Sequence, residues 1–336
     1  MKKEDPLIFV HIGDLHIKNA KEQNYVDFLS VVAQIETNFK TKLDFVFLPG
    51  DNADNGLRGQ YQLIATALKM LSVPTFIIAG DHDMEQGSLD HFYRYLPADH
   101  LPFSKSIRGN RCLFLDVNGT GKGGPDFRLG ESQFLWLEKE FAAAADGAES
   151  IIVLMHCYPD DLADEREKQK LENLIIQHHV VLIDTGHTHY NDLINDGKTI
   201  LSATRSTGQI EEGPVGYSVI SVDDGTVSWR FKMLEEAFPF VVITSPADYR
   251  LSLKERFLEP ATIRAAVFSN HSIKAVKWRF DNQDWTAMQE EDNGKSWTAT
   301  IHADLPKNGL LTVEAIDETG RPGRHSIQLE PLADDN

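Results

Sequence analysis

The stretch LIFVHIGDLH, residues 7–16, joins an apolar run to a polar end. Residues 7–12 are apolar except for His11, a composition typical of a buried β-strand. Asp14 and His16 follow two positions apart, so in extended chain both side chains project to the same side. Carboxylate oxygens and imidazole nitrogens bind divalent transition metals. The stretch therefore predicts a buried strand that ends at a metal site.

Four further segments repeat this arrangement, with Asp or His directly after an apolar run. They are GDNAD at residues 50–54, GDHD at 80–83, MH at 155–156 and GHTH at 186–189. His187 and His189 are again two positions apart. Each segment alone is weak support, because a lone His beside a strand is more often a core residue. Together, the five segments predict a site for two metal ions.

Strands and helices are expected to alternate over the first 235 residues. Apolar runs predict strands at residues 7–12, 44–48, 74–79, 111–117, 151–155 and 180–184. Two helix faces are expected, one from Phe134, Leu137, Phe141 and Ala145, the other from Val26, Leu29, Val32 or Ala33, and Phe39. Strands at residues 198–203, 217–222 and 226–232 are expected to complete a second sheet. The alternation predicts an α/β sandwich that binds ligands beyond the carboxyl ends of its strands.

A strand-only pattern follows Phe238 and Pro239. Short alternating runs lie at residues 240–244, 262–268, 273–280, 296–301, 310–316 and 325–329. We expect an all-β sandwich, immunoglobulin-like or fibronectin-like and without a disulfide, at residues 240–332, after an α/β domain at residues 1–236. Trp278, Trp285 and Trp297 are expected in core or interface packing, with a ligand-binding aromatic surface as the alternative.

In order, residue type and spacing, the five segments resemble the calcineurin-like metallophosphoesterases over residues 7–235. The resemblance implies the four-layer αββα sandwich of that superfamily. Residues 113–117, the Gly-rich residues 119–124 and ESQFLWL at 131–137 look similar to cyclic-nucleotide and glycerophosphodiester phosphodiesterases. The chain departs from that subgroup at residues 156–159, which read HCYP where the subgroup usually has HHPP.

The resemblance also implies how the residues of the five segments divide between two ions. The expected ligands are Asp14, His16 and His189 for one ion, Asp81, His156 and His187 for the other, and Asp51 as the bridge between them. Two neighbouring cations require an anionic bridge between them, and each must keep a coordination position open for water or a phosphate oxygen. The expected ions are Mn, Fe or Zn, with no choice among them.

His82 and Asp54 carry the remaining family roles. The resemblance implies that His82 is a general acid and that Asp54 orients its ring. The alternative is a His that only closes a loop hydrogen bond. Asp81 departs from the family, whose members have Asn at this position. An Asp can still bind a metal, but it adds a negative charge and loses the amide N–H that could donate to a phosphate oxygen.

The expected function is hydrolysis of a small phosphodiester, in which hydroxide derived from metal-bound water attacks phosphorus in line. A phosphomonoesterase and a nucleotide pyrophosphatase are the enzymatic alternatives. A non-catalytic binding or scaffold relative is the third reading, and the extra charge of Asp81 is the feature that favours it.

Charge and composition narrow the partners. The formal net charge is −18 and no cluster of Lys and Arg appears, which argues against nucleic acid and anionic membranes. No signal peptide or membrane span is expected, and Cys112 and Cys157 fall in or beside expected strands, so a cytoplasmic location is expected. A small phosphorylated substrate is the expected partner. A homo-oligomer formed through the C-terminal domain is left open.

Overall fold

The computed structural model describes residues 5–118, 126–253, 262–292, 294–301 and 309–329. Its first sheet has five strands in the order β11-β10-β1-β2-β3. Their bounds are β1 (Leu7–His11), β2 (Phe45–Leu48), β3 (Thr75–Ile77), β10 (Gly216–Asp223) and β11 (Thr226–Met233). Strands β1, β2 and β3 run parallel, while β10 is antiparallel to β1. The carboxyl ends of the three parallel strands therefore share one edge of this sheet.

The second sheet has six strands in the order β4-β5-β6-β7-β9-β8. Their bounds are β4 (Phe103–Ile107), β5 (Asn110–Phe114), β6 (Ser150–Met155), β7 (Val180–Thr185), β8 (Asp192–Asn195) and β9 (Ile200–Ala203). The expectation that residues 198–232 complete this sheet is wrong in part. Strand β9 does join it, but β10 and β11 form a hairpin that pairs with β1 in the first sheet. An apolar hairpin fits either sheet by periodicity, and only the three-dimensional packing selects its partner.

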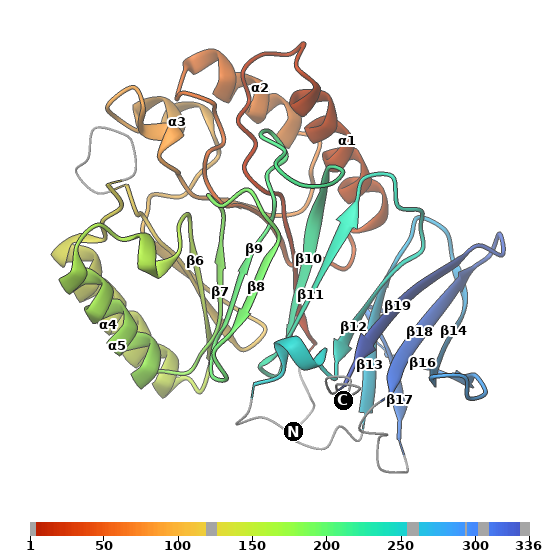
Figure 1. Ribbon diagram of the computed structural model, residues 1–336. Coiled ribbons are helices and arrows are strands. Elements are labelled where there is room, and N and C mark those ends of the chain that lie inside the picture. Colours follow the sequence, from red (N-terminus) through yellow and green to blue (C-terminus); the bar gives the residue numbers. More distant parts are fainter. Residues whose placement is uncertain (1–4, 119–125, 254–261, 293, 302–308, 330–336) are drawn as a thin grey trace, which may run out of the picture.

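Helices cover the outer faces of the two sheets and produce four layers (Figure 1). Helices α1 (Gln23–Asn38), α2 (Arg58–Leu68) and α3 (Asp90–Tyr95) pack on the five-stranded sheet, while α4 (Gly130–Asp146) and α5 (Glu165–Gln177) pack on the six-stranded one. Between the sheets lies an apolar layer that includes Phe9, Phe45 and Phe47 from one sheet and Phe114 and Leu154 from the other. The predicted α/β sandwich is confirmed in these features.

The buried face of α1 differs from the expected one. Val26 is 46% exposed, whereas Phe28, Val31, Val32 and Ile35 are buried. This helix contains apolar residues on more than one face, so spacing alone does not single out the face that meets the sheet. In α4 the expected Phe134, Leu137 and Phe141 are buried, but the next buried position is Ala144 rather than Ala145.

The C-terminal region forms two four-stranded antiparallel sheets, ordered β12-β13-β17-β16 and β15-β14-β18-β19. The bounds are β12 (Phe240–Ser245), β13 (Thr262–Phe268), β14 (Ile273–Phe280), β15 (Thr286–Ala287), β16 (Gln289–Glu290), β17 (Ser296–Thr300), β18 (Leu310–Asp317) and β19 (Pro322–Gln328). Side chains from both sheets, such as Val241, Val276 and Val313, meet in one core. Trp278 and Trp297 pack against this core, as expected, while Lys277 and Arg279 lie over the ring of Trp285.

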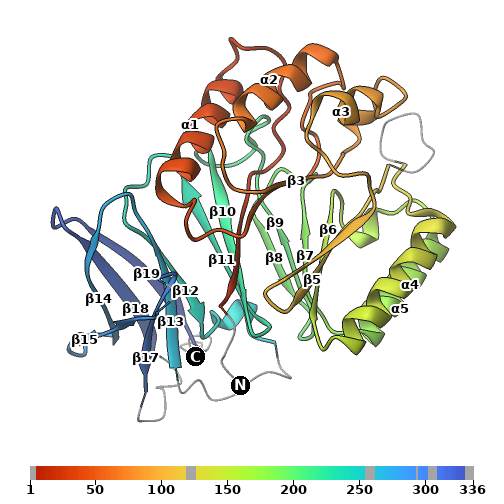
Figure 2. The same cartoon turned by 180° about the vertical axis from the view of Figure 1, so that it is seen from behind.

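The C-terminal sheets pack closely on the first region, near β11 and α1. Phe240, Val242, Ala266 and Phe268 belong to the same buried cluster as α1, and the rings of Phe268 and Phe39 stack with centroids 4.5 Å apart. Figures 1 and 2 agree that these sheets and the α4–α5 pair lie at opposite ends of the molecule.

Short 3₁₀ turns complete the structure at η1 (His82–Met84), η2 (Pro159–Asp161) and η3 (Tyr249–Leu251). Among the described residues, no helix is both long enough and apolar enough to cross a membrane.

Candidate metal centre

All seven expected ligands lie in loops at the carboxyl ends of parallel strands. Asp14 and His16 follow β1, Asp51 follows β2 and Asp81 follows β3. The other three come from the six-stranded sheet, with His156 after β6 and His187 and His189 after β7. The site is therefore built where the facing edges of the two sheets meet, as the sequence predicts for an α/β fold.

The ligand atoms form two groups of four that share Asp51. One group contains Asp14, His16, Asp51 and His189, and the other contains Asp51, Asp81, His156 and His187. Within each group all ligand atoms lie within 4.8 Å of one another. This division is the same as the one expected from the resemblance. Metal binding by these residues itself stays a prediction.

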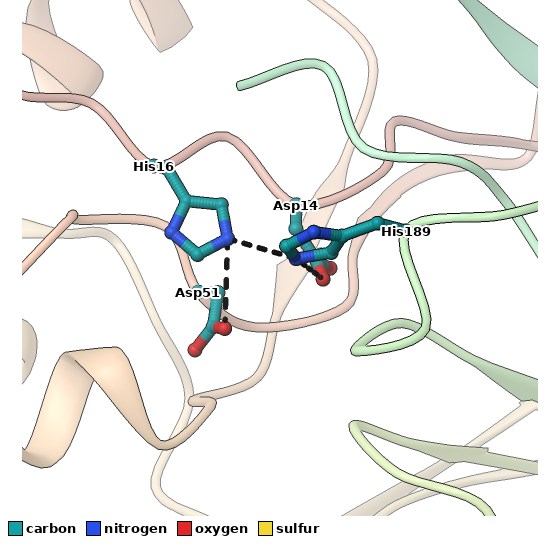
Figure 3. Close-up of side chains that lie close together, drawn as sticks. All are labelled: Asp14, His16, Asp51 and His189. Carbon is teal, nitrogen blue, oxygen red and sulfur yellow. Dashed lines mark hydrogen bonds and ion pairs between the residues drawn. The ribbon is translucent and has the colours of Figure 1, made fainter. Parts of the chain in front are cut away.

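The first group is drawn in Figure 3, where the two His rings and the two carboxylates point toward one another. His16 Nε2 lies 3.1 Å from His189 Nε2 and 3.7 Å from Asp51 Oδ2, and His189 Nε2 lies 3.5 Å from Asp14 Oδ2. Asp14 Oδ1 is buried and has no hydrogen-bond partner in the described structure. An orphaned carboxylate oxygen is costly unless a cation binds it. The donor set therefore fits a metal ion.

The second group is equally compact. His156 Nε2 lies 3.2 Å from Asp81 Oδ1 and 3.5 Å from Asp51 Oδ2, and His187 Nδ1 lies 3.5 Å from Asp81 Oδ1. His156 Nδ1 lies 2.9 Å from the carbonyl oxygen of Pro49, and because a carbonyl only accepts, Nδ1 carries the proton. Nε2 is then the nitrogen that faces Asp51 and Asp81. This nitrogen can bind a metal when the ring is neutral.

The pKa values of the ligand candidates are shifted in different directions. Burial raises the pKa of Asp14, and burial lowers the pKa of His156, but the charge of Asp51 and the hydrogen bonds with Asp51 and Asp81 raise it by more. Burial lowers the pKa of His16 to about 3, although Asp51 acts in the opposite direction, so the ring is neutral. Burial raises the pKa of Asp81, but hydrogen bonds with His156 and His187 outweigh it and hold the pKa well below its usual range. Burial raises the pKa of Asp51, but the charge of His156 and the hydrogen bond with it outweigh burial, so the pKa is lowered overall. Neutral imidazole and ionised carboxylate are the metal-binding forms of these groups.

The loops that carry the ligands have unusual backbone geometry. His16, Asp51, His187 and His189 have φ values of 42°, 47°, 65° and 63°, in the left-handed region that non-glycine residues rarely adopt. Each such residue costs on the order of 1–3 kcal/mol and persists only where the surroundings hold it. Gly80 shows the crowding, because a Cβ there would lie 2.2 Å from Asp51 Oδ1 and 2.7 Å from His156 Cε1. A glycine is therefore required beside Asp51.

Asp83 holds the second and third loops together. Its carboxylate accepts hydrogen bonds from the backbone N–H groups of Asn52, Ala53 and Gly80, from the Asn52 side chain and from the Tyr61 hydroxyl. Burial, followed by the charge of Asp51, raises its pKa to about 6. Only the fold identifies Tyr61 and Asn52 as the partners of this residue.

Gln209 is a supporting residue that the sequence analysis missed. Its side-chain amide lies 3.3 Å from His16 Nδ1, on the side of the ring opposite Nε2, the nitrogen that faces Asp51 and His189. Asn24, on α1, donates hydrogen bonds to the carbonyl oxygens of Leu15 and His16. No motif marks either residue, and only the return of the chain to the site brings them close to His16.

His82 lies beside the first group, with its ring centroid 4.6 Å from that of His16. Its Nδ1 lies 2.7 Å from the backbone carbonyl oxygen of Asp54 and 3.1 Å from Glu85 Oε1. The contact with Asp54 thus involves the main chain, whereas the Asp54 carboxylate lies 3.5 Å from Lys18 Nζ. Burial lowers the pKa of His82. The charge of Asp51 and the hydrogen bond to Asp54 act in the opposite direction and by more, so the pKa is raised overall.

Residues 7–191, more than half of the chain, match the family model described as calcineurin-like phosphoesterase. The chain belongs to the calcineurin-like phosphoesterase family. As a member of this family it is a metal-dependent phosphoric ester hydrolase. The matched residues contain all seven ligand candidates together with His82 and Asp54.

Curated relatives of this phosphoesterase include two that are named after diesterase activity. A probable glycerophosphodiester phosphodiesterase GpdQ of Arcobacter nitrofigilis is 29% identical over 203 residues, covering 54% of this chain and 72% of the relative. The glycerophosphodiester phosphodiesterase GpdQ of Enterobacter lignolyticus is 26% identical over 204 residues, covering 54% and 71%. Among solved structures, a dimetal phosphatase of Danio rerio matches with a TM-score of 0.51 and 15% identity, covering 69% of this chain and 98% of that one. This last match shows a common fold.

Proposed function

We propose that this phosphoesterase hydrolyses small phosphodiesters at a site for two metal ions. One observation carries the proposal, namely the two four-residue groups of oxygen and nitrogen ligands that share Asp51. The names of the two curated relatives support a diester rather than a monoester substrate. We propose Mn, Fe or Zn as the ions, because a mixed set of imidazole and carboxylate ligands suits these metals.

Asp51 has the central role in this proposal. Its carboxylate lies between the two groups and supplies the anionic bridge that two neighbouring cations require. Asp14, His16 and His189 hold one ion, while Asp81, His156 and His187 hold the other. When bound, two such ions activate water for attack on phosphorus and neutralise charge on the phosphate oxygens.

His82 is proposed as the general acid for the leaving oxygen. The bond to the Asp54 carbonyl fixes a proton on Nδ1, which leaves Nε2 as the nitrogen that can transfer a proton. The raised pKa keeps more of the ring protonated near neutral pH, as a general acid requires. The side chain is 31% exposed, so a substrate beside the first group can reach it.

The experiment combines metal analysis with hydrolysis assays. The protein is reconstituted with excess Mn²⁺, Fe²⁺ or Zn²⁺, its metal content is measured, and it is assayed with bis(p-nitrophenyl) phosphate and p-nitrophenyl phosphate. We expect two ions per chain and faster hydrolysis of the diester. Preference for the monoester would refute the diesterase proposal in favour of a phosphomonoesterase, and one ion or none would refute the two-metal site.

Asp51→Asn is the decisive variant in the same assay. It should lose affinity for both ions, because Asp51 belongs to both groups. Asp99→Asn is the matched control, since Asp99 is a half-exposed carboxylate that pairs with Lys105 away from the ligand groups. Loss of only one ion in Asp51→Asn would contradict the bridging role.

We further propose that residues 240–332 are an immunoglobulin-like or fibronectin-like domain, following a catalytic domain at residues 1–236. With β12 to β19 taken in chain order as strands A, B, C, C′, D, E, F and G, the two sheets read A-B-E-D and C′-C-F-G. This order supports the proposal, because immunoglobulin-type sandwiches place A, B, E and D on one sheet and C, F and G on the other. Cys112 and Cys157 are both buried and free, which supports the proposed cytoplasmic location.

A further inference from the structure

A buried polar contact crosses the apolar layer between the two sheets. His11, the last residue of β1, places Nδ1 2.7 Å from Asp184 Oδ2 on β7. Ser202, on β9, donates a hydrogen bond of 2.6 Å to Asp184 Oδ1. All three residues have no exposed surface. His11 comes from the five-stranded sheet, whereas Asp184 and Ser202 come from the six-stranded one.

This contact differs in kind from its surroundings. The layer around it is formed by side chains such as Phe9, Phe114 and Leu154, and apolar packing of this kind has no preferred direction. A buried carboxylate is stable only if it is paired and hydrogen-bonded, so Asp184 requires both of its partners. The His11–Asp184 contact therefore favours one alignment of the sheets in a way that the apolar contacts do not.

Alignment of the sheets determines the geometry of the candidate metal centre. Each ligand group takes residues from both sheets, since His189 completes the first group and His156 and His187 complete the second. His11 lies three residues before Asp14 on the same chain segment, and Asp184 lies three residues before His187. A relative shift of β1 and β7 would thus separate ligand atoms that now lie within 4.8 Å of one another.

We propose that His11, through Asp184 and Ser202, is a positioning residue that sets the alignment of the two sheets and thereby the spacing of the metal ligands. The inference rests on the proposed two-metal site. His11 itself does not bind a metal in this proposal. Its ring edge meets Phe47, with centroids 5.2 Å apart, and its Nε2 is buried without a hydrogen-bond partner in the described structure.

The test uses the full chain and measures metal affinity rather than turnover alone. His11→Phe keeps an aromatic ring against Phe47 but removes the donor to Asp184. His11→Asn places an amide donor near the position of Nδ1, whereas His11→Gln places it one bond further away. For each variant, Zn²⁺ affinity is measured by competition with a chelator, the visible absorption of the Co²⁺-loaded protein is recorded, and the melting temperature of the metal-free protein is determined.

The matched control is Arg264→Met. Arg264 on β13 forms a buried ion pair of 2.7 Å with Asp223, the residue at the end of β10 far from His11. Its loss should lower the melting temperature without changing metal affinity, because this pair lies at the contact with the C-terminal sheets. The control thus separates a general loss of stability from a change in ligand alignment.

We expect His11→Phe to weaken the binding of both ions by about ten- to a hundred-fold and to shift the Co²⁺ absorption, as is usual when residues that orient metal ligands are lost. His11→Asn should restore affinity close to that of the unsubstituted protein, while His11→Gln should not.

The proposal is overturned if His11→Phe binds both ions with unchanged affinity, or if Arg264→Met loses the same affinity at the same melting temperature. If His11→Phe does not fold, equal affinity of the Asn and Gln variants overturns it. If the unsubstituted protein binds fewer than two ions, the proposed two-metal function is refuted and this inference with it. If it binds two ions and His11→Phe does so with unchanged affinity, only the inference about His11 is refuted.

Discussion

Replacing Gly80 with alanine should displace Asp51 and weaken the binding of both proposed metal ions at once. The new Cβ would lie 2.2 Å from Asp51 Oδ1 and 2.5 Å from the backbone nitrogen of Asp51. Ordinary contact begins at 3.4 Å, so the carboxylate has to move by about 1.2 Å. The backbone nitrogen cannot turn away as a side chain can, and the loop itself must therefore shift.

The magnitude follows from this displacement. Overfilling a packed site costs about 1–3 kcal/mol of stability. Metal ligands must be held to within about 0.5 Å of their productive positions, so a shift of more than twice that amount disrupts both groups. We expect metal affinity to fall by at least about ten- to a hundred-fold, the usual effect of losing support for a ligand. This corresponds to about 1.4–2.7 kcal/mol of binding free energy for each ion.

The assay is isothermal titration of the metal-free protein with Zn²⁺, together with thermal unfolding. Gly59→Ala is the matched control, because a Cβ at this exposed position of α2 meets no atom within 4 Å. Alanine should stabilise that helix by about 1 kcal/mol and leave metal binding unchanged. Wild-type affinity for two ions in Gly80→Ala would refute the argument that Asp51 bridges them in the geometry described.

Three further predictions follow from other parts of the molecule. Asp81→Asn should raise diester turnover by about ten- to a hundred-fold at equal measured metal content, because it removes a negative charge and restores an amide donor; equal or lower turnover would identify Asp81 as a tuned ligand. His325 accepts a hydrogen bond from the Ile243 N–H, and burial, with Arg230 and Arg250 nearby, holds its pKa well below 6.5. Below pH 6.5 the unfolded chain therefore binds a proton that the folded chain does not. The wild type should lose more stability than His325→Asn between pH 6.5 and 5 in urea titrations. Truncation after Ala237 should preserve metal binding but lower the melting temperature, because it exposes Phe39, which is buried against Phe268; an unchanged melting temperature would contradict the shared core.

Some features of the site were accessible from sequence for a simple reason. A pair of ligand candidates such as Asp14 and His16 directly follows a buried strand, and parallel strands end at one edge of a sheet. Local order along the chain is therefore enough to predict convergence. The role of Asp54 was less accessible, because a residue can hold a His ring through its side chain or its backbone, and here the backbone carbonyl makes the contact.

Elements with a single local pattern were placed well and ambiguous ones were not. Residues 262–268 and 273–280 were expected as strands and are β13 and β14. Strands β4 and β8 were missed, because both are partly exposed edge strands with mixed composition. The hairpin of β10 and β11 was expected in the wrong sheet, since its apolar residues suit either neighbour.

The sequence by itself determined the α/β class of residues 7–235, the strand-only C-terminal region and the set of metal-ligand candidates, because these depend on local periodicity and on residues that follow strands directly. Only the tertiary structure decided that β10 joins β1, that Asp83 ties two loops together and that His11 meets Asp184 across the sheets. Each of these contacts joins residues that are distant in sequence. The choice of partner depends on how the apolar faces of whole sheets pack against each other, and no short segment of sequence specifies that packing.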